Sequence, residues 1–478
     1  MKLKDSISVF LFPFNLPQGY DFDQFSCEGN EIWESSNIGP DISALLPYVA
    51  SYFANSHMCK SYKLHDNGAP YTTFWDQNKS FEFKTTDENN DDYTFQYKYP
   101  IGRKSSSPML FIMPKANIGI LSISTELEWV QAKGETRKGE DITSHDLMLF
   151  NYRISRQYFK RWRPCDQKVS SGSMVARECQ FKELCALLLS FAGLRESIVK
   201  ARPHIFTYAQ IIEEDTSGSC WPPAETIIRL MRVENLKYKV LATSELFENT
   251  FVDIAMGVCV EGGALITRFV GGSTPEPIRN FKTGSLLPRY LWLYIMAVIQ
   301  RETAISITES LANSDLSQML SAESHELLYA EYERLNHLKL SAYFPDVSDI
   351  SQINRFYGLC VANLHIREYL DSINDKIQGV RSILERRQDL YEREQDKKEW
   401  EMETQQAKLE RQNETRLNGI VLFLTAFTLI SVVNDFSSYV KLYYEWDIFD
   451  WILWPIGSAV VGVAGIAYVI YIWCKYTK

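Results

Sequence analysis

The fold of this chain is decided by residues 419–433, which read Gly-Ile-Val-Leu-Phe-Leu-Thr-Ala-Phe-Thr-Leu-Ile-Ser-Val-Val. Continued to residue 440, the stretch has 22 residues and a single charged one, Asp435. A helix of this length, which rises about 1.5 Å per residue, is long enough to cross a hydrocarbon layer of about 30 Å. We therefore predict a first transmembrane helix over residues 419–440.

A second apolar stretch, residues 451–473, contains no charged residue and predicts a second transmembrane helix. Residues 441–450 then form a short loop between antiparallel helices, and residues 474–478 form a tail. The acidic residues of the loop are Glu445, Asp447 and Asp450. The basic residues that flank the helix pair are Lys408, Arg411, Arg416, Lys475 and Lys478. This distribution predicts that both termini are cytoplasmic and that the loop faces outward, where its acids attract cations.

The remainder of the chain has the composition of a soluble protein. Of the 478 residues, 45% are hydrophobic and 23% are charged, yet residues 419–478 hold only seven charged side chains, so a wholly soluble protein is excluded. The excess of acidic over basic residues, 60 to 50, argues against a non-specific nucleic-acid binder. The nine cysteines form no Cys-x-x-Cys pair, and the N-terminal apolar run is too short for a signal peptide. We expect a cytosolic N-terminal part with reduced thiols.

Residues 1–345 are predicted to form a cytoplasmic sensor domain of the α+β or α/β class. Strand-like patterns occur at residues 7–14, 81–84, 93–99, 110–113, 118–125, 205–212, 251–260 and 264–269. Helical periodicity occurs at residues 41–53, 145–162, 181–194, 225–233, 286–311 and 318–340.

Residues 346–418 are predicted to form a long stalk helix that leads into the first transmembrane helix. Between Gly379 and Gly419 there are 39 residues without Gly or Pro, which as a helix would be about 60 Å long. Ten acidic and eight basic residues between Glu385 and Arg416 allow many local ion pairs. Such a helix could relay a change of shape from the sensor domain to the membrane, but a rigid spacer would have the same sequence.

A polar stripe marks the first transmembrane helix. Its members, which fall within about 80° of arc at 100° per residue or beside that arc, are Thr428, Ser431, Asn434, Asp435 and Ser438. We interpret the stripe as a pore lining, because a ring of acidic residues attracts cations. Alternatively, the hydroxyl groups bond back to the preceding turn and Asp435 lies at the membrane interface. Two spans cannot enclose a pore, so conduction requires several subunits around an axis.

A cluster of basic and aromatic residues stands out between residues 151 and 164 of this acidic chain. The candidate ligand-binding residues are Arg153, Arg156, Tyr158, Lys160, Trp162 and Arg163. Guanidinium groups pair with phosphate, and aromatic rings stack on adenine, so the cluster fits a nucleotide. The alternative is an amphipathic surface helix that pairs with acidic neighbours. The loop at residues 271–274, Gly-Gly-Ser-Thr, is a second candidate for phosphate contact.

Two other groups resemble metal ligands in residue type alone. Residues 87–92, Asp-Glu-Asn-Asn-Asp-Asp, lack the Gly and the distal Glu of an EF-hand loop and are predicted to form a solvated hairpin turn. His57, Cys59 and His65 have the spacing of no standard metal module. The chain has neither a Walker motif nor a Gly-x-Ser-x-Gly motif. We therefore predict that the protein is not an enzyme, and metal ligands stay unassigned.

The arrangement over residues 345–478 resembles the CorA family of divalent-cation channels, which has a long helix continuous with the first span, a short acidic outer loop and a second span that ends in basic residues. The family carries a Gly-Met-Asn signature at the outer end of the first span, where this chain has Val432-Val433-Asn434. Only Asn434 carries over, and the resemblance implies that its amide meets a hydrated cation. The resemblance also implies a homopentamer in the bacterial inner membrane and magnesium as a permeant ion. The missing Gly and Met argue against ordinary magnesium selectivity.

A divergent branch of that family accompanies type III CRISPR defence systems, where the CorA-like protein is the membrane effector of a messenger made of S-adenosyl methionine joined to AMP. The large N-terminal region and the altered signature of this chain resemble that branch. The resemblance implies an antiviral effector that is gated by this nucleotide and acts by ion leakage or membrane disruption. The alternatives are a constitutive magnesium or divalent-cation transporter and a membrane-anchored interaction protein.

Overall fold

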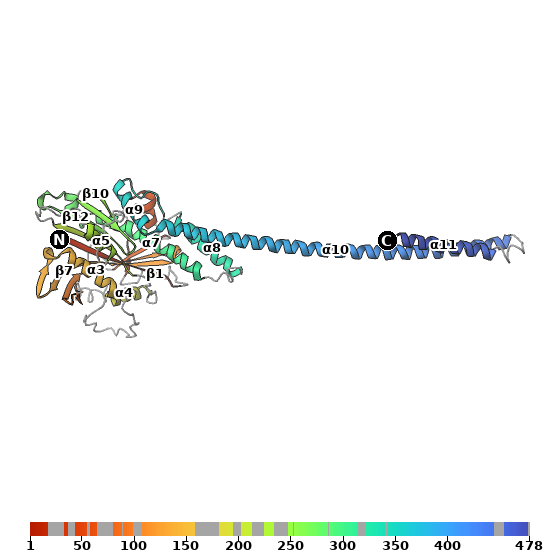
Figure 1. The fold of residues 1–478 in the computed structure, drawn as a ribbon, viewed down its shortest axis with the longest axis horizontal. Coiled ribbons are helices and arrows are strands. Elements are labelled where there is room, and N and C mark those ends of the chain that lie inside the picture. Colours follow the sequence, from red (N-terminus) through yellow and green to blue (C-terminus); the bar gives the residue numbers. More distant parts are fainter. Residues whose placement is uncertain are drawn as a thin grey trace. The chain divides into compact units, whose positions relative to one another are not determined.

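The computed structural model of the chain describes most of the N-terminal region and the long C-terminal helices (Figure 1). The described residues are 1–17, 33–36, 44–54, 58–64, 80–87, 89–98, 108–157, 181–194, 202–212, 224–233, 247–251, 253–284, 286–313, 322–339, 343–443 and 454–476. Inter-residue contacts divide the chain into two compact units, Met1–Gly379 and Val380–Lys478.

The first unit is built on one large sheet. Its strands are β1 (Leu3–Asn15), β2 (Trp33–Ser35), β3 (Lys60–Leu64), β4 (Ser80–Thr86), β5 (Asp92–Lys98), β6 (Met109–Met113), β7 (Ile118–Ala132), β8 (Glu135–Lys138), β9 (His204–Ile212), β10 (Phe247–Phe251), β11 (Ile254–Val258) and β12 (Gly262–Phe269). The main path runs β10-β11-β12-β9-β1-β7-β6-β3-β2, and β5 and β8 pair with β7, while β4 pairs with β5. Among the described strand pairs only β9 and β12 are parallel, so the fold is of the α+β class, one of the two classes that the sequence predicts.

The described helices fall in both units (Figure 1). They are α1 (Pro47–Ala54), α3 (Ser144–Gln157), α4 (Phe181–Ser190), α5 (Ala224–Arg232), α6 (Glu276–Arg279), α7 (Leu286–Asn313), α8 (Ala322–His337), α9 (Ser351–Asn363), α10 (Ile366–Tyr443) and α11 (Trp454–Tyr476).

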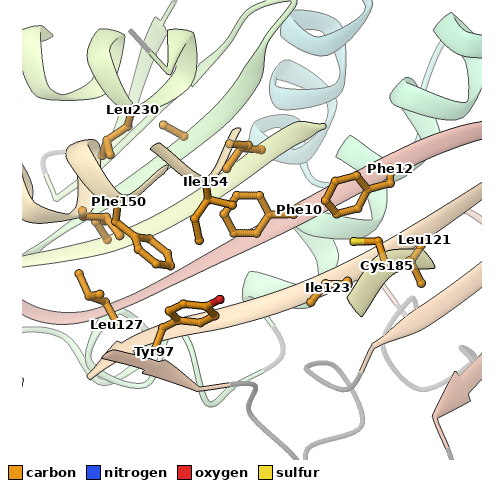
Figure 2. Close-up of a cluster of buried hydrophobic side chains, with 14 of the residues drawn as sticks. Phe10, Phe12, Tyr97, Leu121, Ile123, Leu127, Phe150, Ile154, Cys185 and Leu230 are labelled. Atoms are coloured by element: carbon orange, nitrogen blue, oxygen red, sulfur yellow. The ribbon is translucent and has the colours of Figure 1, made fainter. Parts of the chain in front are cut away.

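One face of the sheet packs against α3, α4 and α5 (Figure 2). Phe10 on β1 meets Phe150 on α3 edge to face, with ring centres 6.4 Å apart. Phe150 also meets Tyr97 of β5 at 5.2 Å. These side chains are almost completely buried, so the aromatic contacts fix α3 across the middle of the sheet.

The opposite face packs against α7. On β6 and β9, residues adjacent to those of the first core point the other way, as side chains alternate along a strand. Phe111 meets Trp292 of α7 with ring centres 5.3 Å apart, and Phe206 meets Tyr294 at 5.2 Å. Because both faces are covered, the central strands are apolar at consecutive positions, which explains the long buried run of β1.

Most predicted strands and helices are present, with some altered bounds. The expected strand 251–260 is shorter in the structure: β11 covers Ile254–Val258, and Phe251 belongs to β10, which pairs with β11. β4 and β5 form a hairpin, as predicted for the segment 87–92, of which residue 88 lies outside the described part. At its turn the Asp87 carboxylate accepts hydrogen bonds from the amides of Asn89 and Asp91 at 2.8 and 2.9 Å. The helix predicted at 41–53 begins only at Pro47 in the structure, and residues 41–43 lie outside the described part.

The 346–418 segment, predicted as one stalk helix, contains a break. Residues Ser351–Asn363 form α9, which buries Ile353 and Phe356 in the first unit. The chain then turns at His365, whose φ of 56° is left-handed, and α10 begins at Ile366. Helix α10 continues without a break through the predicted first transmembrane segment to Tyr443.

Candidate functional site

The apolar part of α10 exposes its side chains on every side. Phe423, Phe427 and Val432 are each more than 60% exposed, and large apolar residues at other angles around the helix are equally open. A helix that is apolar all round is surrounded by protein or by lipid. In the described part of the chain, α10 is the one helix that is both long and apolar enough to cross a membrane.

The polar stripe lies on this apolar part, and its hydroxyl groups are partly engaged. Thr428 Oγ1 donates to the carbonyl oxygen of Thr425 at 2.9 Å, and Ser438 Oγ donates to that of Asn434 at 3.0 Å. The structure thus shows the back-bonding that was the alternative to a pore lining. Asn434 and Asp435 are exposed, as is Ser431, so these three remain the candidates for contact with an ion.

Two further predictions concern the second transmembrane span and the acidic loop before it. The predicted second span corresponds to the helix α11, Trp454–Tyr476. The acidic loop residues Glu445, Asp447 and Asp450 lie outside the described residues.

The candidate ligand site begins on α3, whose first turn is fixed by a capping box. The Thr143 amide donates to Asp146 Oδ2 at 2.8 Å, and the Asp146 amide returns a bond to the Thr143 hydroxyl at 3.4 Å. Arg137 of β8 binds both oxygens of the Asp146 carboxylate, at 2.8 and 2.7 Å. Since Asp146 is buried, this bidentate pair supplies the charge that its burial requires.

Arg153 and Arg156 lie on one face of α3 and share a ring. Their guanidinium carbons are 5.6 and 5.4 Å from the centre of the Tyr152 ring. Arg156 is exposed, whereas Nε of Arg153 is buried without a hydrogen-bond partner in the described part of the chain. An oxyanion is a good acceptor for such an N–H group. The other predicted members, Tyr158, Lys160, Trp162 and Arg163, lie outside the described residues.

Sequence reasoning missed the role of Tyr152, although its position between the basic residues could have indicated it. Two cations within about 6 Å of one ring are the arrangement of a cation–π pair. The ring holds both guanidinium groups on the same turn of α3, and this turn is therefore the best described part of the candidate site.

The second candidate loop is internally bonded. The amides of Ser273 and Thr274 donate to the carbonyl oxygens of Val270 and Gly271, at 3.2 and 3.3 Å. Arg279 binds the carbonyl oxygens of Gly272 and Thr274 at 3.1 and 3.0 Å. Because both amides have partners within the loop, it offers few free donors to a phosphate.

A buried charged group that the sequence did not indicate joins β9 to α7. His204 Nε2 and Arg301 Nη1 lie 3.1 and 2.6 Å from the same oxygen, Oε1 of Glu302. Burial acts to raise the pKa of Glu302, but the hydrogen bond and charge of His204 and the charge of Arg301 outweigh it, so that pKa lies below its usual value. The group holds the start of β9 against α7.

Metal ligands do not converge among the described residues: no group of three or more His, Cys, Asp or Glu side chains could hold an ion there. Of the earlier candidates, His57 and His65 lie outside that part, and Cys59 is buried. Burial raises the pKa of the Cys59 thiol to about 12, which keeps it protonated at neutral pH and unsuited to metal binding.

Comparison of the chain with protein-family models, with curated proteins and with solved structures finds no match.

Proposed function

We propose that this chain is one subunit of a homo-oligomeric, CorA-like membrane channel that opens when its cytoplasmic α+β unit binds an adenine-containing nucleotide messenger. In this proposal α10 and α11 both span the bacterial inner membrane, both termini are cytoplasmic, and cations pass along Asn434 and Asp435. The messenger is S-adenosyl methionine joined to AMP, in antiviral defence. No catalytic step is assigned to the chain.

One observation carries the proposal, namely the continuity of α10. The first turns of this helix are built into the α+β unit, where Ile366, Leu370 and Ile373 are at most 4% exposed. The same helix contains the exposed apolar segment that is suited to lipid. Lys339, just after α8, also donates a hydrogen bond to Asn374 of α10 at 3.1 Å. A displacement of α10 within the sensor unit would thus act on the helix that carries the candidate pore residues.

The α3 turn supports the choice of ligand class. Arg153 and Arg156 supply cationic forks and Tyr152 supplies a ring, which are the groups that a phosphate and an adenine require. In an acidic chain, this local excess of positive charge is the feature that favours an anionic ligand.

The experiment is ion flux from liposomes that contain the full chain. Addition of S-adenosyl methionine–AMP should start the flux, and AMP or S-adenosyl methionine alone should not. Calorimetry with the same purified protein measures binding separately. No heat at tens of micromolar messenger would reject the messenger, and equal flux with and without it would favour a constitutive divalent-cation transporter.

A second candidate function, a membrane-anchored interaction protein, is favoured by the bonds of Thr428 and Ser438. Hydroxyl groups that bond back to their own helix are satisfied in lipid and need no aqueous pore. A chain that stays monomeric in mild detergent and conducts nothing would support this function.

A further inference from the structure

Most of the charged residues of α10 between Gln388 and Arg416 are segregated by sign. Seven of the nine acidic residues in this range fall within about 80° of arc at 100° per residue. This acidic stripe consists of Asp389, Glu392, Asp396, Glu399, Glu403, Glu410 and Glu414. All six basic residues, together with the other two acidic residues Glu394 and Glu401, fall within an arc of about 140° whose centre is about 150° away from that of the acidic stripe, so this face has an excess of four positive charges. This basic stripe consists of Arg393, Lys397, Lys398, Lys408, Arg411 and Arg416.

Few charges of opposite sign are neighbours on this helix, and those four residues apart, such as Glu394 and Lys398 or Lys397 and Glu401, form no ion pair among the described residues. The side chains of both stripes are exposed, and in the described part of the chain no basic-stripe residue has an acidic partner within 4 Å. The ion pair that the structure does show on α10, Arg381 with Glu385 at 2.9 Å, precedes the stripes. The many local ion pairs expected from composition are therefore absent from this described segment.

Like charges also stack along the acidic stripe. The pairs Glu392–Asp396, Glu399–Glu403 and Glu410–Glu414 are each four residues apart, the spacing at which side chains of a helix are neighbours. Like charges at this spacing destabilise a helix. A positively charged surface packed against the acidic stripe would turn this destabilisation into stabilisation.

We propose that the acidic stripe of one copy of α10 docks on the basic stripe of an adjacent, parallel copy. This inference rests on the proposed function, because it requires the oligomer and the common orientation that membrane insertion gives to all copies. The occupant of each stripe is then a second copy of the chain, which carries the complementary stripe at the same height.

The position of the two stripes on different faces of α10 also determines the symmetry of the proposed oligomer. In a parallel two-fold dimer a face contacts the same face of its partner, which would put acid against acid. Two different faces that fit each other form a heterologous contact, and such contacts close into a ring of three or more subunits. The stalk segments thus form a ring in which each copy contacts two neighbours through ion pairs.

The test uses three variants of the full chain. The first reverses the acidic stripe and carries the substitutions Glu392→Lys, Asp396→Lys, Glu399→Lys and Glu403→Lys. The second reverses the basic stripe and carries Arg393→Glu, Lys397→Glu, Lys408→Glu and Arg411→Glu. The third combines all eight substitutions and restores complementary stripes. Each chain is expressed with two different tags, and capture of one tag by the other in mild detergent measures assembly.

The first and second variants should each lose self-capture on the order of tenfold, because most of the charges on their two faces then have the same sign. When the first and second variants are co-expressed, each should capture the other, because their facing surfaces then have opposite charge. The third variant should capture itself but not the wild type, which also shows that eight substitutions do not destroy the helix. Self-capture of the first or second variant at the wild-type level, or no gain on co-expression, would overturn the proposal.

Light scattering of the wild type separates this inference from the proposed channel. A monomeric wild type would overturn both. If the wild type is oligomeric and the stripe variants assemble as well as it does, the stripe contact is overturned and the proposed channel is not affected. Wild-type assembly that falls apart on chelation of divalent cations, but not at raised salt, would show ions bridging acidic stripes and would also overturn the contact.

Discussion

The side-chain amide of Asn151 donates a hydrogen bond to the hydroxyl group of Thr207, 2.9 Å away, and so ties the middle of α3 to strand β9. The same side chain accepts a bond from Ser8 Oγ of β1 at 2.7 Å. All three residues are at most 1% exposed. The helix that carries Arg153 and Arg156 is therefore fixed to the sheet by a polar link inside an apolar layer.

Replacement of this link should lower stability. Asn151→Ala leaves the hydroxyl groups of Ser8 and Thr207 buried without their partner, and we expect a loss of about 2–3 kcal/mol in the free energy of unfolding. Urea unfolding of the full chain in detergent, followed by near-ultraviolet circular dichroism, measures it. Arg156→Ala, at an exposed position of the same helix, should change the value by less than about 0.5 kcal/mol. Equal effects of the two substitutions would contradict the prediction.

The α3 turn should bind the anionic part of the proposed messenger. Arg153→Ala should weaken binding about tenfold or more, because a charge-assisted hydrogen bond contributes about 1.5–3 kcal/mol. Calorimetry with S-adenosyl methionine–AMP gives the dissociation constant. Lys138→Ala, an exposed cation on β8, is the matched control and should leave binding unchanged. If both variants bind as the wild type does, the ligand site lies elsewhere.

The sequence predicts those strands and helices whose own residues show an apolar pattern. Strand β6 is apolar at five consecutive positions and is predicted at nearly its observed bounds. Strands β3, Lys-Ser-Tyr-Lys-Leu, and β8, Glu-Thr-Arg-Lys, are not predicted, because their polar residues give no strand signal on their own. They form through pairing with β6 and β7, which is information that a local pattern does not contain.

The same limit applies to the candidate site. Arg153 and Arg156 are three residues apart, so helical spacing alone predicts their common face. Asn151 acts through Ser8 and Thr207, which are 143 and 56 residues away in the chain. Glu302 likewise meets His204 across 98 residues. Contacts between such distant positions follow from the sheet order, which the sequence does not reveal.

The Glu302 group should make stability depend on pH in the acid range. Its pKa is lowered in the folded chain from the usual 4.5, so the ionised carboxylate stabilises the fold above about pH 4.5. That contribution is lost as the pH falls through the folded value. The stability difference between the wild type and Glu302→Gln should therefore shrink as the pH falls below about 4.5.

A second variant checks the cause of this shift. His204→Gln removes the charge that lowers the pKa of Glu302 but keeps a side chain able to donate a hydrogen bond. The pH range over which Glu302 loses its contribution should then move upward. An unchanged range in thermal unfolding curves of the variant would show that the charge of His204 does not set the pKa of Glu302.

Substitutions in the polar stripe of α10 should change the flux of cations. If Asp435 lines a pore, a ring of carboxylates concentrates cations there, and Asp435→Asn should reduce cation flux about tenfold, which corresponds to about 1.4 kcal/mol per ion. Asn434→Ala should also reduce flux, because it removes the amide proposed to meet the hydrated ion. Thr428→Val is the matched control, since the Thr428 hydroxyl already bonds to the Thr425 carbonyl and valine has a similar shape. Liposomes loaded with a fluorescent ion indicator measure all three variants under the same messenger concentration. Flux that is insensitive to Asp435→Asn and Asn434→Ala would remove both residues from the pore and favour the anchor function of α10.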